Sequence, residues 1–409
     1  MEEKNKQTNE KIEEVKVEND AQAIKNEEIK KKEKIVEKTK KITRKIAFAI
    51  LMILLVFYVT DLIRIKLNMP VIFSMWGRQY EVEYEETEMQ IVTSLEDKIT
   101  ENTAWCGTFN LIWNDLKKDL AKQDIVFQEQ TEKVINLNRG TFSTKDLSED
   151  SYYKVYGKPT PKLKEQIEKA IRIKFNEKSD ILDDFDFEGA GENDYFLYAM
   201  LKKDFKFENV FTELENGKFG NYENVQYFGI NEQTEEVVRN QVKVLYYESK
   251  DNFAIKLTTK ENDEIILLKG IKKDNFLEIY KEITEQSEKY EGNKNFTEMD
   301  KLKIPNISFK LKEEIKEVEN KPFRFSDGRE YVIQKALQTI QFDLDKEGGK
   351  IKSEAGMMLK ESAIIKDEIE NREFYIDDTF TIFLQEEGKE LPYFAAQISN
   401  IGNVQENIK

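Results

Sequence analysis

The sequence predicts an α+β protein with mostly antiparallel sheets, whose helices precede most of its strands. Helical spacing of apolar residues occurs at 108–120 and at Pro161–Phe175, both before Asp194. Beyond Asp194, runs rich in β-branched and aromatic residues are separated by short polar turns. Single strands do not alternate there with single helices, as a parallel sheet would require, so antiparallel sheets are favoured.

The composition excludes several classes of function. The 409-residue chain is 35% charged with a formal net charge of −16, so we expect no nucleic-acid partner. It contains no histidine, which removes Ser-His-Asp and Cys-His catalysis and most zinc sites. We therefore expect no enzymatic activity, no catalytic residue, no metal and no cofactor. The lone Cys106 cannot form an intramolecular disulfide and is expected to be a small buried side chain.

The N-terminal part predicts a membrane anchor. Residues 1–45 are mostly Glu, Lys, Asn, Gln and Thr, which predicts either a solvated helix or, as we favour, a disordered charged segment. Residues 46–63 are almost entirely apolar and, as a helix, would rise about 27 Å, enough to cross a hydrocarbon core. A cleaved signal peptide is disfavoured because a long segment precedes the apolar run and no small-residue cleavage site follows it.

The flanking charges predict the orientation of this anchor. Nine basic residues lie between Lys30 and Lys45, whereas only Arg64 and Lys66 closely follow the apolar run. The positive-inside rule therefore places the N-terminus in the cytoplasm and the C-terminal part outside the cell. We expect a single-pass protein of the cell membrane with an extracellular stalk at 64–88 and one ectodomain at 89–405.

Strands and helices of the ectodomain are predicted in chain order. Residues 195–201 form a nearly continuous apolar run, as in a central strand. Further strands are predicted where residues alternate in polarity or are β-branched and aromatic, at 225–230, 242–247, 253–258 and 264–269. A short helix at 276–284 leads to an extended segment at 302–309. Two apolar runs, 380–384 and 393–398, flank a glycine-containing turn and predict a closing hairpin.

A strand pattern that runs into a double glycine is the most informative stretch of the chain. Ile340, Phe342 and Leu344 alternate with polar residues and are followed by Gly348 and Gly349. The same period of two continues beyond the glycines. One face would carry Gly349, Ile351, Ser353, Ala355 and Met357, and the other Lys350, Lys352, Glu354 and Gly356. This pattern predicts a loop with a flexible hinge that can become a strand.

The C-terminal half resembles the serpin family of serine protease inhibitors, from about Asp194 to Ile401. Residues 374–384 are similar to the family signature. The matching residues are Phe374, Asp377, Thr379, Phe380 and Ile382, whereas Asp378 and Thr381 differ. The closing hairpin, the strand before the double glycine, and the segments 302–309 and 195–207 follow in the family's order. The part between Asn102 and Asp194 is shorter than in the family, and Cys106-Gly107 replaces a Ser-Pro pair.

The resemblance implies a divergent, membrane-anchored, bacterial-type serpin with an exposed reactive loop. An extracellular serine protease would cleave this loop and be held as an acyl-enzyme while the loop enters the main sheet as a new strand. The hinge would comprise Gly348, Gly349, Lys350, Ile351, Lys352, Ser353, Glu354 and Ala355. Counting from the hinge leads to Ser362 and Ala363, whereas Lys360, Lys366 and Arg372 would suit trypsin-like proteases, with Lys366 favoured.

A rival interpretation is a surface binding or structural protein that has the same fold but does not inhibit. Inhibitory members of the family favour small residues in the hinge, and Lys350, Ile351, Lys352 and Glu354 depart from that pattern. In this interpretation the loop never inserts.

Overall fold

The computed structural model describes residues 89–188, 191–350 and 371–405 of the chain. The predicted segments 1–45, 46–63 and 64–88 lie outside the described residues, and their roles stay predictions. The chain divides into the units Met1–Glu85 and Glu86–Lys409, and all described residues belong to the second. Within the described part, no helix is long and apolar enough to cross a membrane.

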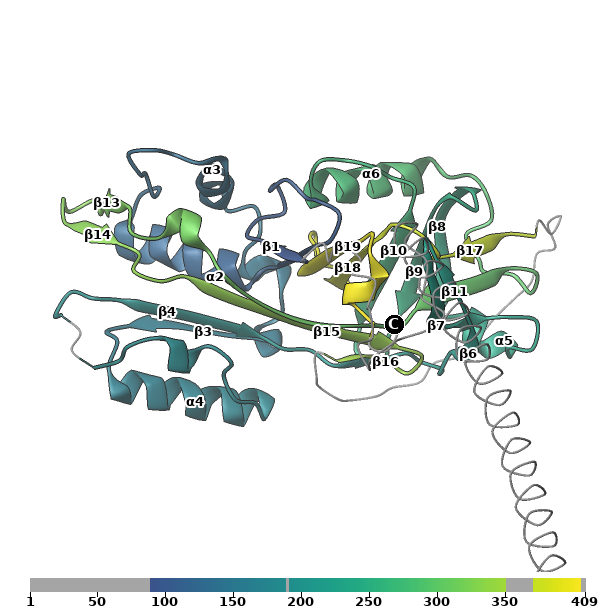
Figure 1. Ribbon diagram of the computed structural model, residues 1–409, viewed down its shortest axis with the longest axis horizontal. Coiled ribbons are helices and arrows are strands. Elements are labelled where there is room, and N and C mark those ends of the chain that lie inside the picture. The colour runs from purple at the N-terminus through teal and green to yellow at the C-terminus, as the bar shows by residue number, and fades with distance from the viewer. Residues whose placement is uncertain (1–88, 189–190, 351–370, 406–409) are drawn as a thin grey trace, which may run out of the picture. The chain divides into compact units, whose positions relative to one another are not determined.

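The largest sheet has seven strands and contains the predicted closing hairpin (Figure 1). Its order is β1 (Gln90–Val92), β2 (Thr103–Cys106), β19 (Phe394–Ile398), β18 (Phe380–Glu386), β10 (Asp263–Lys269), β9 (Asn252–Thr258) and β8 (Val242–Ser249). β18 and β19 pair antiparallel, with Phe380 opposite Ile398, which confirms the hairpin. Helix α6 (Phe276–Lys289) packs on this sheet through Phe276 and Tyr280, whose rings contact Phe383, and it is longer than predicted.

Two four-stranded sheets carry the segments before and after the double glycine. One has the order β17 (Glu373–Tyr375), β11 (Lys301–Pro305), β7 (Tyr222–Ile230) and β6 (Thr212–Phe219). The other has the order β12 (Ile307–Glu314), β15 (Leu337–Asp345), β16 (Gly348–Lys350) and β5 (Phe205–Lys206). The predicted extended segment 302–309 is therefore two strands in two sheets, divided at Asn306, where the chain passes from the pairing with β7 to the pairing with β15.

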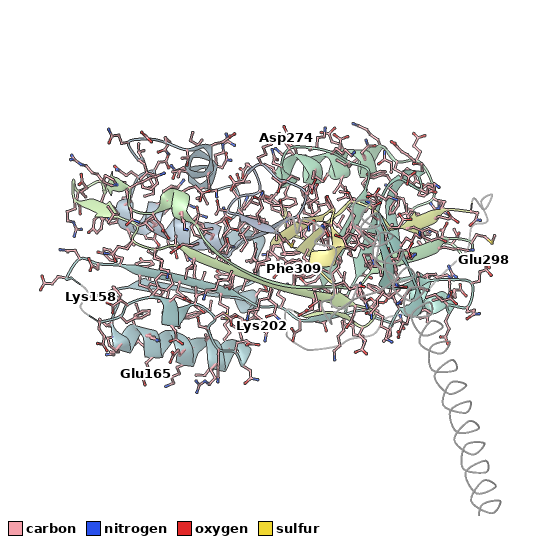
Figure 2. The ribbon with its side chains drawn as sticks, viewed as in Figure 1. Lys158, Glu165, Lys202, Asp274, Glu298 and Phe309 are labelled. Atoms are coloured by element: carbon pink, nitrogen blue, oxygen red, sulfur yellow. The ribbon has the colours of Figure 1, made fainter. Side chains whose placement is uncertain are left out.

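Two smaller sheets complete the strands of the described residues. β13 (Pro322–Arg324) pairs with β14 (Glu330–Val332), and β3 (Tyr152–Gly157) pairs with β4 (Phe196–Leu201). Aromatic side chains join the larger sheets: Phe309 of β12 lies 5.9 Å from Phe342 of β15 and 6.5 Å from Phe394 of β19, ring centre to ring centre (Figure 2). Most strand pairs are antiparallel, so the predicted α+β class with antiparallel sheets is confirmed.

Both predicted N-terminal helices are present. α2 (Thr108–Asp115) continues into a π-helical turn at Leu116–Ala121. α4 (Pro161–Phe175) has the predicted bounds, because the Thr160 hydroxyl accepts a hydrogen bond from the N–H of Leu163 and Asn176 ends the helix in a left-handed conformation. The short helices α3 (Glu132–Arg139) and α5 (Glu236–Arg239) were not predicted.

The β3–β4 pair lies between these two helices (Figure 1). Phe196 and Tyr198 of β4 pack with Ile167 and Ile171 of α4. Leu197 points to the other face and packs on the cluster that contains residues of α2. The prediction that β4 is a central strand is wrong for this state, because β3 is its sole partner among the described strands. Its apolar character comes from the helices on its two faces.

Candidate functional site

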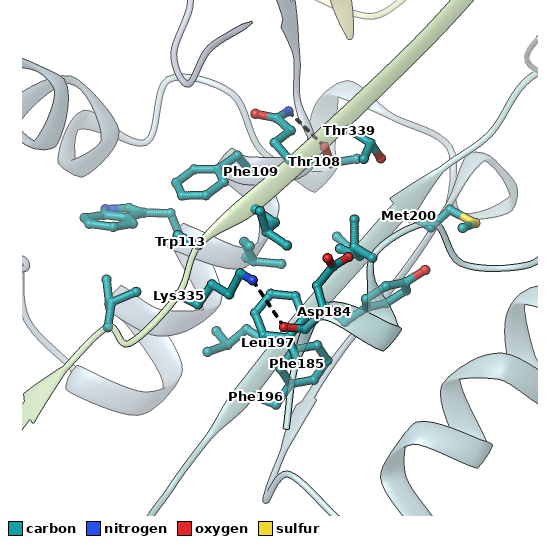
Figure 3. Close-up of a pocket in the computed structure, with 18 of the residues that line it drawn as sticks. Thr108, Phe109, Trp113, Asp184, Phe185, Phe196, Leu197, Met200, Lys335 and Thr339 are labelled. Carbon is teal, nitrogen blue, oxygen red and sulfur yellow. Dashed lines mark hydrogen bonds between the residues drawn. The ribbon is translucent and has the colours of Figure 1, made fainter. Parts of the chain in front are cut away.

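A cleft separates β4 from β15. β15 pairs with β12 along its length, but on its other edge it pairs with β16 only at Asp343–Asp345. β4 presents its unpaired edge to the same space. The resulting cleft has a volume of about 1190 Å³ and is lined by residues of both strands (Figure 3). One end of this gap in the sheet is filled by β16, and the rest contains no described strand.

Apolar side chains of α2 form the floor of the cleft. The residues are Phe109, Ile112, Trp113 and Leu116. Figure 3 shows Phe109 and Trp113 on one side and Leu197 of β4 on the other. The amphipathic spacing of α2 explains this arrangement, because apolar residues three and four positions apart share one helix face. The floor can therefore receive apolar side chains from a strand placed above it.

The segment that follows α4 bridges the cleft to the strands on its far side. Lys310 Nζ lies 3.0 Å from Asp180 Oδ1, and Lys312 Nζ lies 2.5 Å from Asp184 Oδ2. Lys335 donates to the carbonyl oxygen of Asp184 at 3.3 Å (Figure 3). These lysines belong to β12 and to the approach to β15. Each ion pair is partly exposed and contributes about 0.2–1 kcal/mol, so the bridge can be displaced at low cost.

The predicted hinge glycines lie in the sheet. Gly348 has a φ of +146°, and a Cβ atom there would collide with the carbonyl oxygen of Phe205. At Gly349 a Cβ atom would collide with the ring of Phe205 and lie 2.8 Å from the carbonyl oxygen of Asp343. Only glycine therefore fits between β15 and β5. The rest of the proposed hinge after Lys350, together with Lys360, Ser362, Ala363 and Lys366, lies outside the described residues and its role stays a prediction.

Gln338 ties β15 to the start of α2 and was missed in the sequence. Its side chain is 3% exposed, and Nε2 donates to the carbonyl oxygen of Cys106 at 2.9 Å and to Thr108 Oγ1 at 3.1 Å. Its Oε1 has no partner within the described part of the chain. The sequence does contain a signal for this role: Gln338 is a polar residue on the same strand face as the apolar Ile340 and Phe342. Cys106 is buried as expected, and burial raises the pKa of its thiol to about 11.

The signature residues are structural in this state. Phe374 is fully buried, with its ring centre 4.9 Å from that of Tyr247 and 5.2 Å from that of Phe253. Asp377 accepts a hydrogen bond from Lys269 at 2.7 Å. The remaining signature residues that are buried are Phe380 and Ile382 in β18, and Thr379 is half-buried in the bend before that strand. The signature thus anchors the chain after the loop segment.

Arg372 is not an exposed recognition residue, and that prediction is wrong. The side chain is 3% exposed and contacts both carboxylate oxygens of Asp300, at 3.0 Å and 2.7 Å. It also donates to the carbonyl oxygens of Asn293 and Asn295. The structure therefore assigns Arg372 to fixing the start of β17. The charge of Arg372 does not indicate a buried partner, because Asp300 lies far away in the chain.

Lys203, between β4 and β5, reaches two buried carboxylates. Its Nζ contacts Asp263 Oδ1 and lies 2.8 Å from Glu386 Oε1. Tyr393 donates to Asp263 Oδ1 at 3.1 Å. Burial raises the pKa of Asp263, whereas for Glu386 burial is outweighed by hydrogen bonds from Lys203 and Ser151, which lower the pKa. Because both carboxylates are buried, no substrate can reach them and their role is structural.

Comparisons with known proteins give structural similarities at low sequence identity. No protein-family model and no curated protein matches the chain. Among solved structures, Serpin48 of the insect Tenebrio molitor is similar, with 13% identity and a TM-score of 0.35, covering 63% of this chain and 78% of that one. Thyroxine-binding globulin in complex with thyroxine is similar at 12% identity with the same TM-score and coverage. A TM-score of 0.35 is too low to support a conclusion about fold or function.

Proposed function

We propose that this protein is a membrane-tethered, serpin-like inhibitor of extracellular serine proteases that acts by cleavage and insertion of its loop. One observation carries the proposal. The edges of β4 and β15 flank a gap that already holds the short strand β16 at one end. A longer strand in the same place would pair with both edges. The tethering rests on the apolar run at 46–63.

The register of β16 matches the alternation of the residues that follow it. β16 pairs antiparallel with β15, with Leu344 opposite Gly349. Continuing that register would place Ile351 and Ser353 opposite Phe342 and Ile340, which are buried at 0% and 4% exposure. Residues directly opposite one another in a sheet point to the same face. The core-facing set in the sequence is therefore the set that would meet the floor of the cleft.

The charged residues would face the other way. In the same register Lys352 would lie opposite Gln341, which is exposed, and Glu354 opposite Thr339, which is half-buried. The departures from small residues in the hinge thus fall mostly on the face away from the core. This favours insertion over a loop that never enters the sheet.

The energy for such a mechanism comes from completing the sheet. Each new ladder hydrogen bond contributes about 1 kcal/mol net, and apolar burial adds roughly 25 cal/mol per Å². This gain stays unrealised before cleavage only if the intact state is kinetically trapped. The bridge between the segment after α4 and β12 is one contact that must yield as the strand enters.

The test is to mix the full-length protein with a panel of serine proteases. Inhibition predicts a covalent complex that survives denaturing electrophoresis. Cleavage of the loop should also raise the unfolding temperature, because the inserted strand completes the sheet. Cleavage without a covalent complex and without a rise in unfolding temperature would contradict the proposal. That result would favour the rival function of a non-inhibitory surface binding protein, for which the apolar cleft of about 1190 Å³ is the supporting observation.

A further inference from the structure

A second pocket lies where the chain continues from β5 to β6, and it carries exposed apolar and acidic side chains. It has a volume of about 540 Å³ and is lined by residues from the β5–β6 connection and from the segment that leads into α5. Val210 is 56% exposed and Val237 is 46% exposed. We call the following residues the valine patch: Val210, Val237, Glu208, Glu235 and Glu236.

The carboxylates of the valine patch have no ion-pair partner among the described residues. Glu208, Glu235 and Glu236 are exposed, and none of them forms an ion pair with another described residue. By contrast, the neighbouring Glu213 and Glu232 are paired with Lys346 and Lys301, at 2.6 Å and 2.9 Å. The patch therefore combines two solvent-exposed valines with a free negative rim, and its chemistry suits a basic surface that carries an apolar group.

Partly buried hydrogen bonds hold the valine patch in a fixed shape. The N–H of Asn209 donates to Gln241 Oε1 at 2.9 Å, and Gln241 Nε2 donates back to the Asn209 carbonyl at 2.8 Å. The hydroxyls of Thr212 and Thr234 lie 2.8 Å apart and join the two lining segments. A surface fixed in this way loses little conformational entropy when a partner binds.

The position of the valine patch connects it with the hinge. The N–H of Phe211 donates to the carbonyl of Lys346 at 2.9 Å, and the N–H of Phe207 donates to that of Glu347 at 3.0 Å. Lys346 and Glu347 form the turn between β15 and β16. The patch therefore adjoins the turn that leads into β16. Glu232, three residues before Glu235, pairs with Lys301, which lies opposite Glu373 of β17, so the patch is also near the described end of the chain that follows residues 351–370.

We propose that the valine patch is a docking surface for the protease that cleaves the loop, and that it selects proteases with a basic surface beside their active-site cleft. The inference rests on the proposed function. Unpaired carboxylates near the loop would accelerate the encounter with a cationic enzyme, and this acceleration would weaken with salt. The valines would add apolar contact once the complex has formed.

The experiment compares cationic and anionic trypsin, which share a specificity for cleavage after Lys and Arg but differ in surface charge. The full-length protein and its variant Glu208→Gln/Glu235→Gln/Glu236→Gln are incubated with each enzyme. The measured quantity is the second-order rate constant for reaction of the protease with the loop, and both products, covalent complex and cleaved protein, are included in it. For cationic trypsin at low salt, we expect the variant to react about three- to ten-fold more slowly. Little change is expected for anionic trypsin or at high salt.

A matched variant controls for net charge. Glu101→Gln/Glu129→Gln/Glu165→Gln removes the same charge from exposed positions elsewhere, including the outer side of α4 (Figure 2). It should leave the rate constant nearly unchanged. Equal slowing by both triple variants, or no slowing by the patch variant, would overturn the inference, as would a loop that neither trypsin engages. Because the ratio of complex to cleavage is read separately, failure of inhibition is distinguishable from failure of docking. A change in oligomeric state of the patch variant would instead identify a second copy as the occupant.

Discussion

At the scale of single residues, two buried sites contain charged side chains whose role is structural. Lys203 neutralises one charge of a site that contains both Asp263 and Glu386, and Asp263 Oδ2 has no partner in the described part of the chain. Arg372 and Asp300 form a pair that is 3% and 0% exposed. Both sites lie at ends of strands that border the cleft or follow the loop. Arg372 was a recognition candidate in the sequence, but burial gives the charged groups of both sites a structural role.

Replacing Asp263 with Asn should change how stability depends on pH. Burial raises the pKa of Asp263 above its ordinary value of 3.8, so folding favours the protonated form. Its stabilising contribution is full below the unfolded-state pKa and is lost as pH rises through the raised folded-state pKa. Asp263→Asn stays neutral throughout. The unfolding temperature of the variant relative to wild type should therefore increase from about pH 4 to pH 7.

Thermal unfolding across this pH range measures the effect. The exposed Asp119→Asn provides the control and should show a nearly constant difference from wild type. A difference for Asp263→Asn that stays flat or decreases with pH would contradict the assignment.

Replacing Arg372 with Met should destabilise the protein strongly. The change leaves the Asp300 carboxylate buried without its partner, which costs about 3–5 kcal/mol. Arg324 and Glu330 form a pair that is 71% and 58% exposed. Arg324→Met should therefore cost less than about 1 kcal/mol. Denaturant unfolding of both variants gives the two free energies, and similar small losses would show that the Arg372 pair is not needed.

At the scale of elements, β16 connects local backbone geometry with the proposed mechanism. The strand is short and has one neighbour on each side, β15 and β5. Its glycines allow the close approach of Phe205, so the strand can occupy the end of the gap. The double glycine follows directly after the turn at Lys346 and Glu347, and it permits tight pairing of β16 with both neighbours.

Gly349→Ala should displace β16 from the sheet. The added Cβ would collide with Phe205, and overpacking of this kind costs about 1–3 kcal/mol. We expect faster hydrogen exchange at the amides of β5 and of Asp343–Asp345, together with lower stability. Gly157→Ala in β3 is the control, because a Cβ there would lie at an ordinary 3.6 Å from Leu163. Unchanged exchange in Gly349→Ala would mean that β16 does not depend on close packing.

At the scale of the whole molecule, the proposed insertion mechanism depends on three described parts: the cleft, β16 and the buried start of β17. β15 leads into the hinge, and β17 is fixed by Arg372 and Phe374 after the loop. The gap that could receive the loop lies beside β15. In the proposed mechanism, cleavage between β16 and β17 would free the β16 side to enter the gap while β17 stays in its own sheet.

The two faces of the loop segment give a matched pair of variants. In the register of β16, Ala355 would lie opposite the buried Gln338, whereas Glu354 would lie opposite the half-buried Thr339. Ala355→Arg should place a charge beneath the sheet, slow insertion and shift the product from covalent complex to simple cleavage. Glu354→Arg should retain the complex. The ratio of the two products on denaturing gels measures the shift, and an equal ratio in both variants would refute the predicted register.

The pattern of apolar residues was sufficient for much of the fold. Pro161–Phe175 became a helix with its predicted bounds, and the hairpin of β18 and β19 formed as expected. These elements are specified by near neighbours in the chain: a cap at Thr160, a proline in the first turn, and a short turn between apolar runs. Where burial arises from helices on two faces, as in β4, the same pattern led to the wrong strand neighbours.

The sequence by itself determined the α+β class, the double glycine that follows a strand and the alternation of the residues after it, because each depends on local spacing. Tertiary structure alone decided that β4 and β15 lie on either side of an open gap, that Gln338 joins β15 to α2, and that Arg372 is buried against Asp300. Those features depend on contacts between residues that are distant in the chain. Local periodicity fixes which face of a strand is apolar, but it does not fix which edge finds a neighbour.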